Sequence, residues 1–250
     1  MQNMLIWISD LGHGPLYFLI ALSLMLGGWL SSDRSQKQLN QYFWLGWRLT
    51  IFWLIGILLN TALKYYFIHP RPWWVDPNIS PLHPRPAGGF GMPSGHTQSA
   101  MGMLILGYWL GQFRAKLGKT LSIRFSLFIG VALSWIGLIA WSRIYLHAHS
   151  LAQVATGATV GLVWIFALSW LEKQDKVAEL LVCLIVLLSM GCFWQIFNPI
   201  TNLPQEYLVR LTEYQVTVPL KPSSIMVVTV GLTSLFWVFM LRIYRKNEES

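Results

Sequence analysis

Three groups of polar residues lie at the ends of apolar runs, and their side-chain types suit the binding and transfer of a phosphate. The groups are Lys64 with Arg71-Pro72, then Pro93-Ser94-Gly95-His96, and then Ser142-Arg143 with His149. Together they supply fixed positive charges, backbone N–H donors at a helix start and two imidazoles. A phosphate site with a nucleophile and an acid needs these parts.

The middle group opens the apolar run Ser94–Phe113. A helix start attracts anions through its free N–H groups and the positive end of the helix dipole. Gly95 lets a phosphate approach the backbone closely, and His96 is placed to give a proton to a leaving oxygen. Taken alone, Ser94 is explained as a helix N-cap, and His96 is explained equally well as an interfacial histidine with a structural bond.

Lys64 and Arg71 flank the end of the run Phe43–Phe67, where Pro70 and Pro72 stop the helix. A lysine in this position alone is explained by snorkelling to the membrane interface. The tetrapeptide that contains Arg71, His-Pro-Arg-Pro, recurs with Arg85 in the same place. Arg71 is preferred to Arg85 as a phosphate ligand because of its spacing to Lys64.

The last group bridges two apolar runs, with Arg143 ending one and His149 preceding the next. Arg143 offers planar, forked donors that match a phosphate. A histidine nucleophile would form a phosphohistidine and so divide ester hydrolysis into two steps. His149 is preferred to the nearby His147 for this role.

The composition places these residues in a membrane. The 250-residue chain is 54% hydrophobic and 11% charged, with a mean hydropathy of +0.49, whereas soluble domains carry charge on about a quarter of their residues. A spanning helix needs about 20 mostly apolar residues, and the candidate runs are Pro15–Leu30, Phe43–Phe67, Ser94–Phe113, Phe125–Trp141, Leu151–Leu171, Val177–Phe197 and Ile225–Tyr244. The sequence thus predicts an all-α, polytopic membrane helix bundle that forms one domain, residues 1–250.

Two further points bear on the class of protein. No Lys or Arg precedes the first run, so this run is expected to be a retained helix rather than a signal peptide. Cys183 and Cys192 lie inside one apolar run and are expected to be packing residues, not a disulfide or metal pair. No other group of side chains indicates a metal site, and no cofactor is expected.

The basic residues predict the orientation in the bilayer. Seven spans would place on one side Arg34, Lys37, Arg48, Arg114, Lys116, Lys119, Arg124, Lys173, Lys176, Arg242, Arg245 and Lys246. The other side would hold Lys64, Arg71, Arg85, Arg143, Arg210 and Lys221. The first side is therefore predicted to be cytoplasmic, with the three polar groups facing the opposite compartment. The net charge of +8 is explained by this topology, and no nucleic-acid partner is expected.

The three groups together resemble the signature motifs of the type 2 phosphatidic acid phosphatase (PAP2) superfamily, K-x6-RP, PSGH and SR-x5-H. The resemblance covers about Lys64 to Gly161. It implies that His149 is the nucleophile, that His96 is the general acid, and that Lys64, Arg71 and Arg143 bind the phosphate together with Ser94 and the Gly95 backbone. It also implies a metal-independent reaction and a six-helix core, so that a seventh helix would be an addition.

One position departs from the commonest pattern of the family. Many members carry Asp four residues after the nucleophile, where this chain has Gln153. On a helix Gln153 shares a face with His149 and can accept a hydrogen bond from its ring, but it supplies no negative charge. Ser150 and Gln153 also fit a capping box, and the two interpretations remain open together. The glucose-6-phosphatase and dolichyl-diphosphatase branches, which this chain resembles locally around Arg71 and Ser94, also carry Gln here.

The expected function is a membrane phosphatase that hydrolyses a lipid phosphate or diphosphate through a phosphohistidine. Bacterial inner membrane is the expected location, with the site facing the periplasm or outer face. The alternatives are a phosphatase of a soluble sugar phosphate, a lipid-to-acceptor phosphotransferase and, less favoured, a non-catalytic lipid-binding or transport protein.

Trp73 and Trp74 are expected to be interfacial anchors more than pocket walls, and Asn198–Ser223 a connecting loop more than a lid. The expected partners are the lipid substrate and membrane lipids, and the oligomeric state stays open.

Overall fold

The computed structural model of the chain describes residues 1–30, 36–86, 89–115, 121–174, 176–198, 200, 202–217 and 221–248. Within these ranges all regular secondary structure is helical. The helices are α1 (Gln2–Leu11), α2 (Gly14–Leu30), α3 (Gln36–Phe67), α4 (Pro72–Val75), α5 (Gly95–Ala100), α6 (Gly102–Ala115), α7 (Leu121–Tyr145), α8 (Leu151–Leu171), α9 (Val177–Phe197), α10 (Gln205–Glu213) and α11 (Ser224–Glu248). The predicted all-α class is confirmed.

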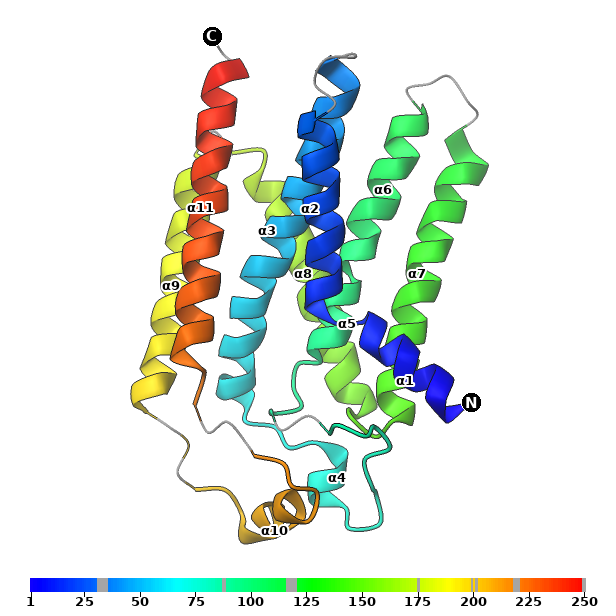
Figure 1. Cartoon of the computed structure of the whole chain (residues 1–250), viewed down its shortest axis with the longest axis vertical. Coiled ribbons are helices and arrows are strands. Elements are labelled where there is room, and N and C mark those ends of the chain that lie inside the picture. The colour runs from blue at the N-terminus through cyan, green and yellow to red at the C-terminus, as the bar shows by residue number, and fades with distance from the viewer. Residues whose placement is uncertain are drawn as a thin grey trace.

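The long helices run roughly side by side and form a bundle (Figure 1). Each predicted apolar run except Ser94–Phe113 lies in a single helix of this bundle, and the bounds of α8 and α9 are those expected from the sequence. The short helices α4 and α10 lie together at one end, and the C-terminus lies at the other (Figure 1). Cys192 is buried, as expected of a packing residue, whereas Cys183 is exposed.

The bundle is that of a multi-pass membrane protein. Among the described residues, Tyr42–Val75, Ser126–Tyr145, Leu151–Leu171 and Val177–Phe197 are long and apolar enough to cross a bilayer. The pair α1 and α2, bent by 49° at its break, adds a fifth span if it is counted as one. Large apolar side chains stay exposed along these helices, Val163 and Phe166 on α8 among them, which suits contact with lipid. The full count of seven spans stays a prediction.

The helices differ from those expected at two places: the start of the chain and the third apolar run. No predicted run covers α1, a ten-residue helix that packs against α7. The run Ser94–Phe113 is divided at Met101 into α5 and α6. The short α5 packs against α3, α7 and α8, so that the helix break sets the PSGH residues among several helices.

Two glycines of α8 let it approach α5 closely. A Cβ on Gly157 would lie 2.5 Å from the carbonyl oxygen of Ser94, and a Cβ on Gly161 would lie 2.7 Å from Cγ of Met101. Small residues spaced four apart permit this kind of close contact between helices in membranes. The start of α5 is thereby held against the start of α8, where His149 and Gln153 lie.

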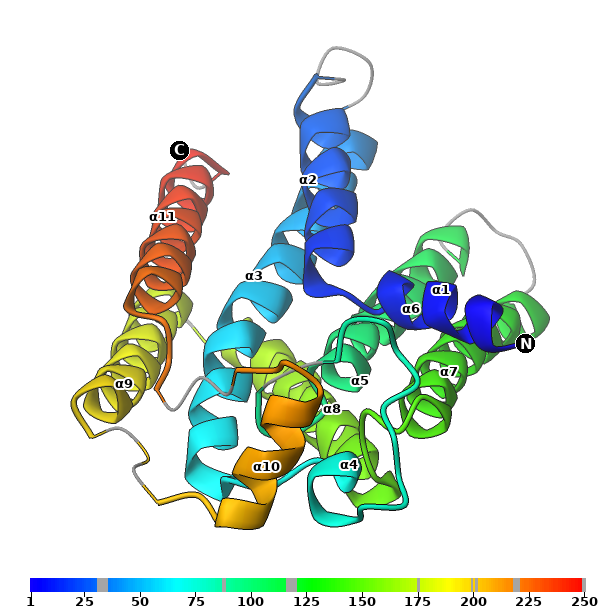
Figure 2. The same ribbon diagram turned by 60° about the horizontal axis from the view of Figure 1, so that its bottom comes forward.

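A cap made of α4 and α10 covers the same end of the bundle (Figure 2). Trp73 and Trp74 are both 1% exposed and pack in an apolar cluster with Phe90, Tyr65 and Leu211. Arg210 of α10 donates hydrogen bonds to the carbonyl oxygens of Trp73 (3.2 Å) and Ile79 (2.8 Å). The expectation that the two tryptophans are interfacial anchors is therefore wrong. The segment expected to be a plain loop contains a helix, because its apolar residues pack on these indoles.

Candidate active site

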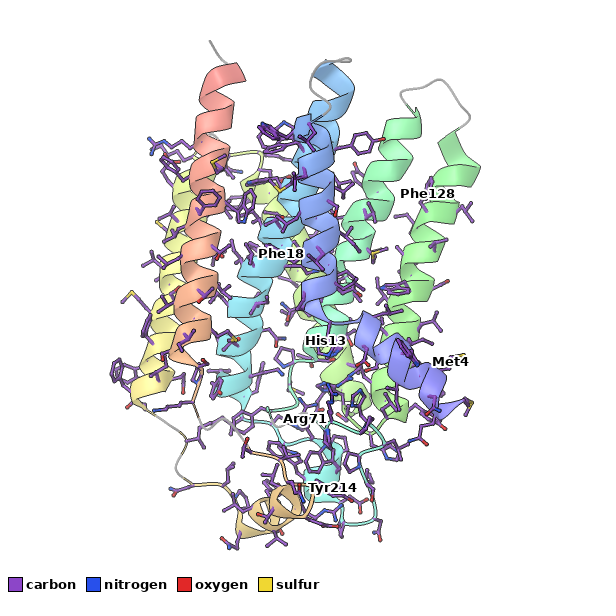
Figure 3. All side chains as sticks on the ribbon, in the orientation of Figure 1. Met4, His13, Phe18, Arg71, Phe128 and Tyr214 are labelled. Carbon is purple, nitrogen blue, oxygen red and sulfur yellow. The ribbon has the colours of Figure 1, made fainter. Side chains whose placement is uncertain are left out.

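The structure brings the three sequence motifs together at the capped end of the bundle. Lys64 comes from the end of α3, Arg71 directly precedes α4, His96 lies in the first turn of α5, and Arg143 and His149 flank the turn between α7 and α8. Arg71, Arg143 and His149 are 2%, 5% and 2% exposed, respectively. Figure 3 shows Arg71 at this end, below His13 of the α1–α2 junction.

The ring of His149 is held with its Nε2 atom toward the cationic side chain of Arg71. Its Nδ1 lies 2.8 Å from the carbonyl oxygen of Gly91 and 3.3 Å from Oε1 of Gln153. Both neighbours are hydrogen-bond acceptors, so Nδ1 carries the hydrogen in the neutral ring. Nε2 then presents a lone pair and lies 3.2 Å from Nη1 of Arg71, a donor. This is the tautomer in which Nε2 can act as a nucleophile.

Gln153 takes part in both arrangements that the sequence left open. Its side-chain Oε1 accepts a hydrogen bond from the backbone N–H of Ser150 at 3.1 Å. The backbone N–H of Gln153 donates to Oγ of Ser150 at 3.3 Å, which completes a capping box. The same Oε1 lies 3.3 Å from Nδ1 of His149. The other atom of the Gln153 amide, Nε2, donates to the carbonyl oxygen of Pro70 at 2.6 Å. The Gln153 amide is therefore fixed by Ser150 and Pro70. Of the two acceptors near Nδ1 of His149, the Gly91 carbonyl oxygen is the closer one.

Gly91 is needed where it stands because the backbone touches the Gln153 amide. A Cβ at Gly91 would lie 2.5 Å from Oε1 of Gln153. We expect Gly91→Ala to push the amide off Ser150 and Pro70 and to tilt His149, and therefore to lower kcat/KM about tenfold. The rate of phosphate release in detergent measures the loss of kcat/KM, and the thermal unfolding temperature measures the effect on the fold.

A matched control for this substitution is Gly137→Ala on α7, where an added Cβ meets nothing within 4 Å. It should leave both activity and unfolding temperature at the wild-type level or slightly raise the latter, since Ala favours a helix. Equal behaviour of the two variants would contradict the assigned role of Gly91.

Arg71 fixes the loop before α5 as well as facing His149. Its Nε donates to the carbonyl oxygen of Gly89 at 2.6 Å, and its Nη1 donates to that of Ala148 at 2.7 Å. Lys64 lies close by, since its Nζ is 4.0 Å from the position of a Cβ on Gly89. The preference for Arg71 over Arg85 agrees with this geometry, because Arg85 is exposed at the rim.

The cluster of cations lacks matching carboxylates. Among the described residues, no ion pair joins Lys64, Arg71 or Arg143 to an Asp or Glu side chain. Nε of Arg143 and Nε2 of His96 are buried and have no hydrogen-bond partner in this part of the chain. Buried cations and orphaned polar atoms are costly unless an anion with several acceptors binds them. A phosphoryl group meets this requirement.

His149 is kept uncharged by its surroundings. Burial, followed by the positive charges of Arg71, Arg143 and Lys64, holds the pKa of His149 well below its ordinary value of 6.5. Desolvation and like charges both disfavour the imidazolium form. The imidazole of His149 is therefore neutral across the physiological range of pH.

This pKa has a consequence for stability. Above pH 6.5 the ring is neutral in the folded and the unfolded chain, so it contributes no pH dependence. Below that pH the unfolded chain binds a proton that the folded chain does not, and the free energy of unfolding falls, by up to about 1.4 kcal/mol per pH unit. We expect the unfolding temperature of the wild type to drop between about pH 6.5 and 5 more than that of His149→Asn, measured in detergent. Equal drops would contradict the assigned protonation.

Ser94 and Gly95 are placed differently from each other. Ser94 is fully buried, its Oγ lies 3.1 Å from Oγ1 of Thr97, and it makes no side-chain bond that caps α5. Gly95 borders a cavity beside His96. The role of Ser94 as a phosphate ligand stays a prediction. His147, the alternative to His149, points away, with Nδ1 2.7 Å from the carbonyl oxygen of Ser80.

Several residues of the site were missed from the sequence. Asn60 Nδ2 donates to Oε1 of Gln98 at 2.7 Å and so ties α5 to α3. Ser9 of α1 accepts a hydrogen bond from Nη1 of Arg143, and the rings of His13 and His96 are 4.5 Å apart. Asn60 offered a signal, being a polar residue within an apolar run. Ser9 and His13 offered none, because they precede the segment that carries the motifs.

Comparison with known proteins shows the family of the chain. The chain is 29% identical over 171 residues, 62% of its length, to sphingosine-1-phosphate phosphatase 1 of Mus musculus, and the aligned part spans about a third (34%) of that protein. The fold is similar, with a TM-score of 0.51 and 22% identity, to the crystal structure of a transmembrane PAP2 type phosphatidylglycerolphosphate phosphatase from Bacillus subtilis, covering 70% of this chain and 78% of the other. The sequence model of the PAP2 superfamily matches residues 42–176. The chain therefore belongs to the PAP2 superfamily.

Proposed function

We propose that this protein is a membrane phosphatase that hydrolyses a lipid phosphate or diphosphate ester through a phosphohistidine on His149. The observation that carries the proposal is the His149 ring, with Nδ1 bound to the Gly91 carbonyl oxygen and Nε2 facing Arg71. The cations around it make no ion pair with a carboxylate among the described residues. A lone pair aimed at a site for an anion is what nucleophilic phosphoryl transfer requires.

The reaction follows in two steps from these positions. The anionic substrate binds together with a proton on His96, which offsets the cations that otherwise keep this ring neutral. The Nε2 lone pair of His149 attacks phosphorus, the bond from phosphorus to the leaving oxygen breaks, and the His96 imidazolium gives that oxygen its proton. A water molecule, losing a proton to His96, then attacks phosphorus, and the P–N bond electrons return to Nε2. Arg71, Arg143 and Lys64 stabilise the equatorial oxygens in both steps. Phosphate leaves, and both histidines return to their first state.

A lipid is the favoured substrate because of where the site lies and what the chain resembles. The site is at the helix ends of an apolar bundle, so a headgroup can reach it while the hydrocarbon chains stay in the bilayer. The name of the mouse relative, a sphingosine-1-phosphate phosphatase, indicates a lipid phosphate as well. The mouse protein is much longer than the aligned segment, so its substrate is a guide to the class and not to the compound.

The site is proposed to face the non-cytoplasmic compartment. The C-terminal end of α11, which carries Arg242, lies at the end of the bundle away from α4 and α10 (Figure 1), and basic residues at helix ends favour the cytoplasmic side. A cysteine at exposed Asn78, near the cap, should react with a membrane-impermeant thiol reagent in intact cells, whereas one at Lys173 should not. The reverse labelling would overturn this orientation.

The function itself is tested by phosphate release in detergent from an isoprenyl diphosphate, phosphatidic acid, a phosphatidylglycerol phosphate and a sphingoid phosphate. Release from at least one lipid, together with an acid-labile phosphoenzyme after a short reaction with labelled substrate, is expected. An intact protein that releases phosphate from none of them would overturn the lipid assignment, and product analysis would show transfer if phosphate moved to another acceptor.

A further inference from the structure

The junction between α1 and α2 brings a second histidine against His96. The His13 and His96 rings meet edge to face, with centroids 4.5 Å apart and planes at 62°. A Cβ on Gly12 would lie 3.1 Å from Cδ2 of His96, so the backbone of the junction touches the same ring. The junction precedes residues 42–176, the segment that matches the family. His13 therefore comes from outside the part of the chain that carries the family motifs.

Tertiary contacts fix the position of this junction. Ser9 of α1 accepts a hydrogen bond from Nη1 of Arg143, and Nε2 of Gln2 donates to the carbonyl oxygen of Leu82 at 3.0 Å. On the other side of the break, α2 packs against α3 and α5. His13 is therefore held in place by both of the helices that it joins.

The two stacked rings differ in their access to solvent. His13 is exposed, whereas Nε2 of His96 is buried and has no hydrogen-bond partner among the described residues. An imidazole has two ring nitrogens, so it can take up a proton on one of them and release a proton from the other. A pair of this kind can connect a buried acid with bulk water.

The proposed reaction requires His96 to exchange a proton with solvent in every turnover. Burial, followed by nearby positive charges of which that of Arg143 is the largest, holds the pKa of His96 well below its ordinary value of 6.5. The ring must therefore gain a proton when the anionic substrate binds and lose it when phosphate leaves. Because Nε2 is buried, this proton needs a path through other groups.

A polar cavity of about 90 Å³ connects the two rings with the rim of the site. Its charged or titratable lining residues are Asp10, His13, His83, Arg85, His96 and Arg143. The volume exceeds the roughly 30 Å³ that one water molecule occupies in the liquid, and every one of these side chains can hydrogen-bond to water. The Asp10 carboxylate repels a phosphoryl group, so the cavity suits water and protons better than it suits the substrate.

Asp10 also supports a proton on His13. The backbone N–H of His13 donates to the carbonyl oxygen of Asp10 at 3.1 Å, which places both residues on one turn, and a carboxylate near an imidazole favours the protonated ring. The other charged or titratable groups of the lining oppose it: His83 and Arg85 from the loop after α4, His96 from α5 and Arg143 from α7. These opposing influences suit a group that must both gain and lose a proton.

We propose that His13 carries protons between solvent and His96 in each turnover. As the substrate binds, His13 takes a proton from bulk water on one ring nitrogen and gives the proton of the other nitrogen to a water molecule in the cavity, which passes one to His96. When phosphate leaves, the transfers run in reverse, and His13 ends neutral as it began. The inference rests on the proposed phosphatase function and makes His13 a positioning residue that acts through His96 by supplying its proton.

The test compares His13→Ala with His13→Phe on the preferred lipid in detergent. Both variants remove the relay and should lower kcat about tenfold, less than the 10²- to 10⁴-fold that loss of a general acid costs. His13→Ala leaves the space of one imidazole ring beside His96, whereas the Phe ring fills it. Free imidazole in the buffer should therefore restore most of kcat in His13→Ala and none in His13→Phe. It should leave the wild-type rate unchanged, which excludes imidazole as an acceptor of the phosphoryl group.

Leu11→Ala is the matched control for a disturbed junction. Leu11 and His13 are both exposed, so all three variants should unfold near the wild-type temperature, and Leu11→Ala should also keep the wild-type rate. An unchanged rate in His13→Ala would overturn the relay. So would a lowered rate that imidazole does not restore, since that is the behaviour of a merely structural residue, or an equal recovery of both His13 variants.

The outcomes separate this inference from the phosphatase function. A wild type that is active and loses its activity on His149→Ala keeps the proposed function, whatever the His13 variants do. If the wild type released phosphate from none of the lipids named above, the function and the relay would fall together. Recovery by imidazole in His13→Ala alone would support the relay.

Discussion

His149→Ala is expected to lower phosphate release from the preferred lipid by about 10⁴-fold or more, as removal of a covalent nucleophile does in other hydrolases. The physical reason is that no other side chain can replace the lone pair that Nε2 holds beside Arg71. His147 is directed to Ser80, and His96 lies on α5 in contact with His13. Steady-state phosphate release and the loss of the labelled phosphoenzyme measure the effect.

His149→Asn is the matched control for folding. The Asn amide nitrogen can donate to the Gly91 carbonyl oxygen as Nδ1 of His149 does, so this variant should unfold near the wild-type temperature at neutral pH while being as inactive as His149→Ala. Residual activity of either variant above about a hundredth of the wild-type rate would contradict the nucleophile assignment. Such a result would direct attention to His96 as the residue that is phosphorylated.

Arg71→Lys should produce the next largest loss, about 10³-fold in kcat/KM, although the positive charge is kept. The guanidinium binds the carbonyl oxygens of Gly89 and Ala148 and also faces Nε2 of His149, and an ammonium group cannot present this planar fork. One lost donor to a developing charge accounts for 10²- to 10³-fold. The displaced loop also lowers the unfolding temperature, because buried carbonyl oxygens lose their partners.

Arg85→Lys is the comparison that decides between the two arginines of the repeated tetrapeptide. Arg85 is exposed, near Asp10 and His83, so the same exchange should change kcat/KM by less than about threefold, the range of a solvated charge. A larger loss for Arg85→Lys than for Arg71→Lys would reverse the assignment of the family motif. Both variants are compared at the same ionic strength, since exposed charges are screened by salt.

The sequence by itself determined the membrane class, most helix positions and the residues that meet in the site. Apolar runs of spanning length need no tertiary information, because a bilayer forces each one to satisfy its backbone within a helix. The bounds of α8 and α9 were therefore predicted without error. The capping box of Ser150 and Gln153 was predictable because it is a local pattern, with partners three residues apart.

Only the tertiary structure decided how the catalytic groups are supported. The Gly91 carbonyl oxygen that holds His149 has no sequence signature, because every residue carries such an oxygen. The division of the third run at Met101 follows from the packing of α5 between α3 and α8. The packing of α10 on Trp73 depends on contacts between residues 137 positions apart. Local patterns carry no information on such pairings.

The contacts of the α1–α2 junction with the site are the clearest case that local sequence patterns do not predict. Asp10, Gly12 and His13 precede the motifs and show no spacing to them, yet His13 contacts His96 and Ser9 binds Arg143. Their position is set by the 49° bend between the two helices and by the packing of α1 on α7. The sequence predicted which groups would bind and attack a phosphate, because their types and spacing are chemical requirements. The tertiary structure determined the walls around them, because those arise from packing between distant segments.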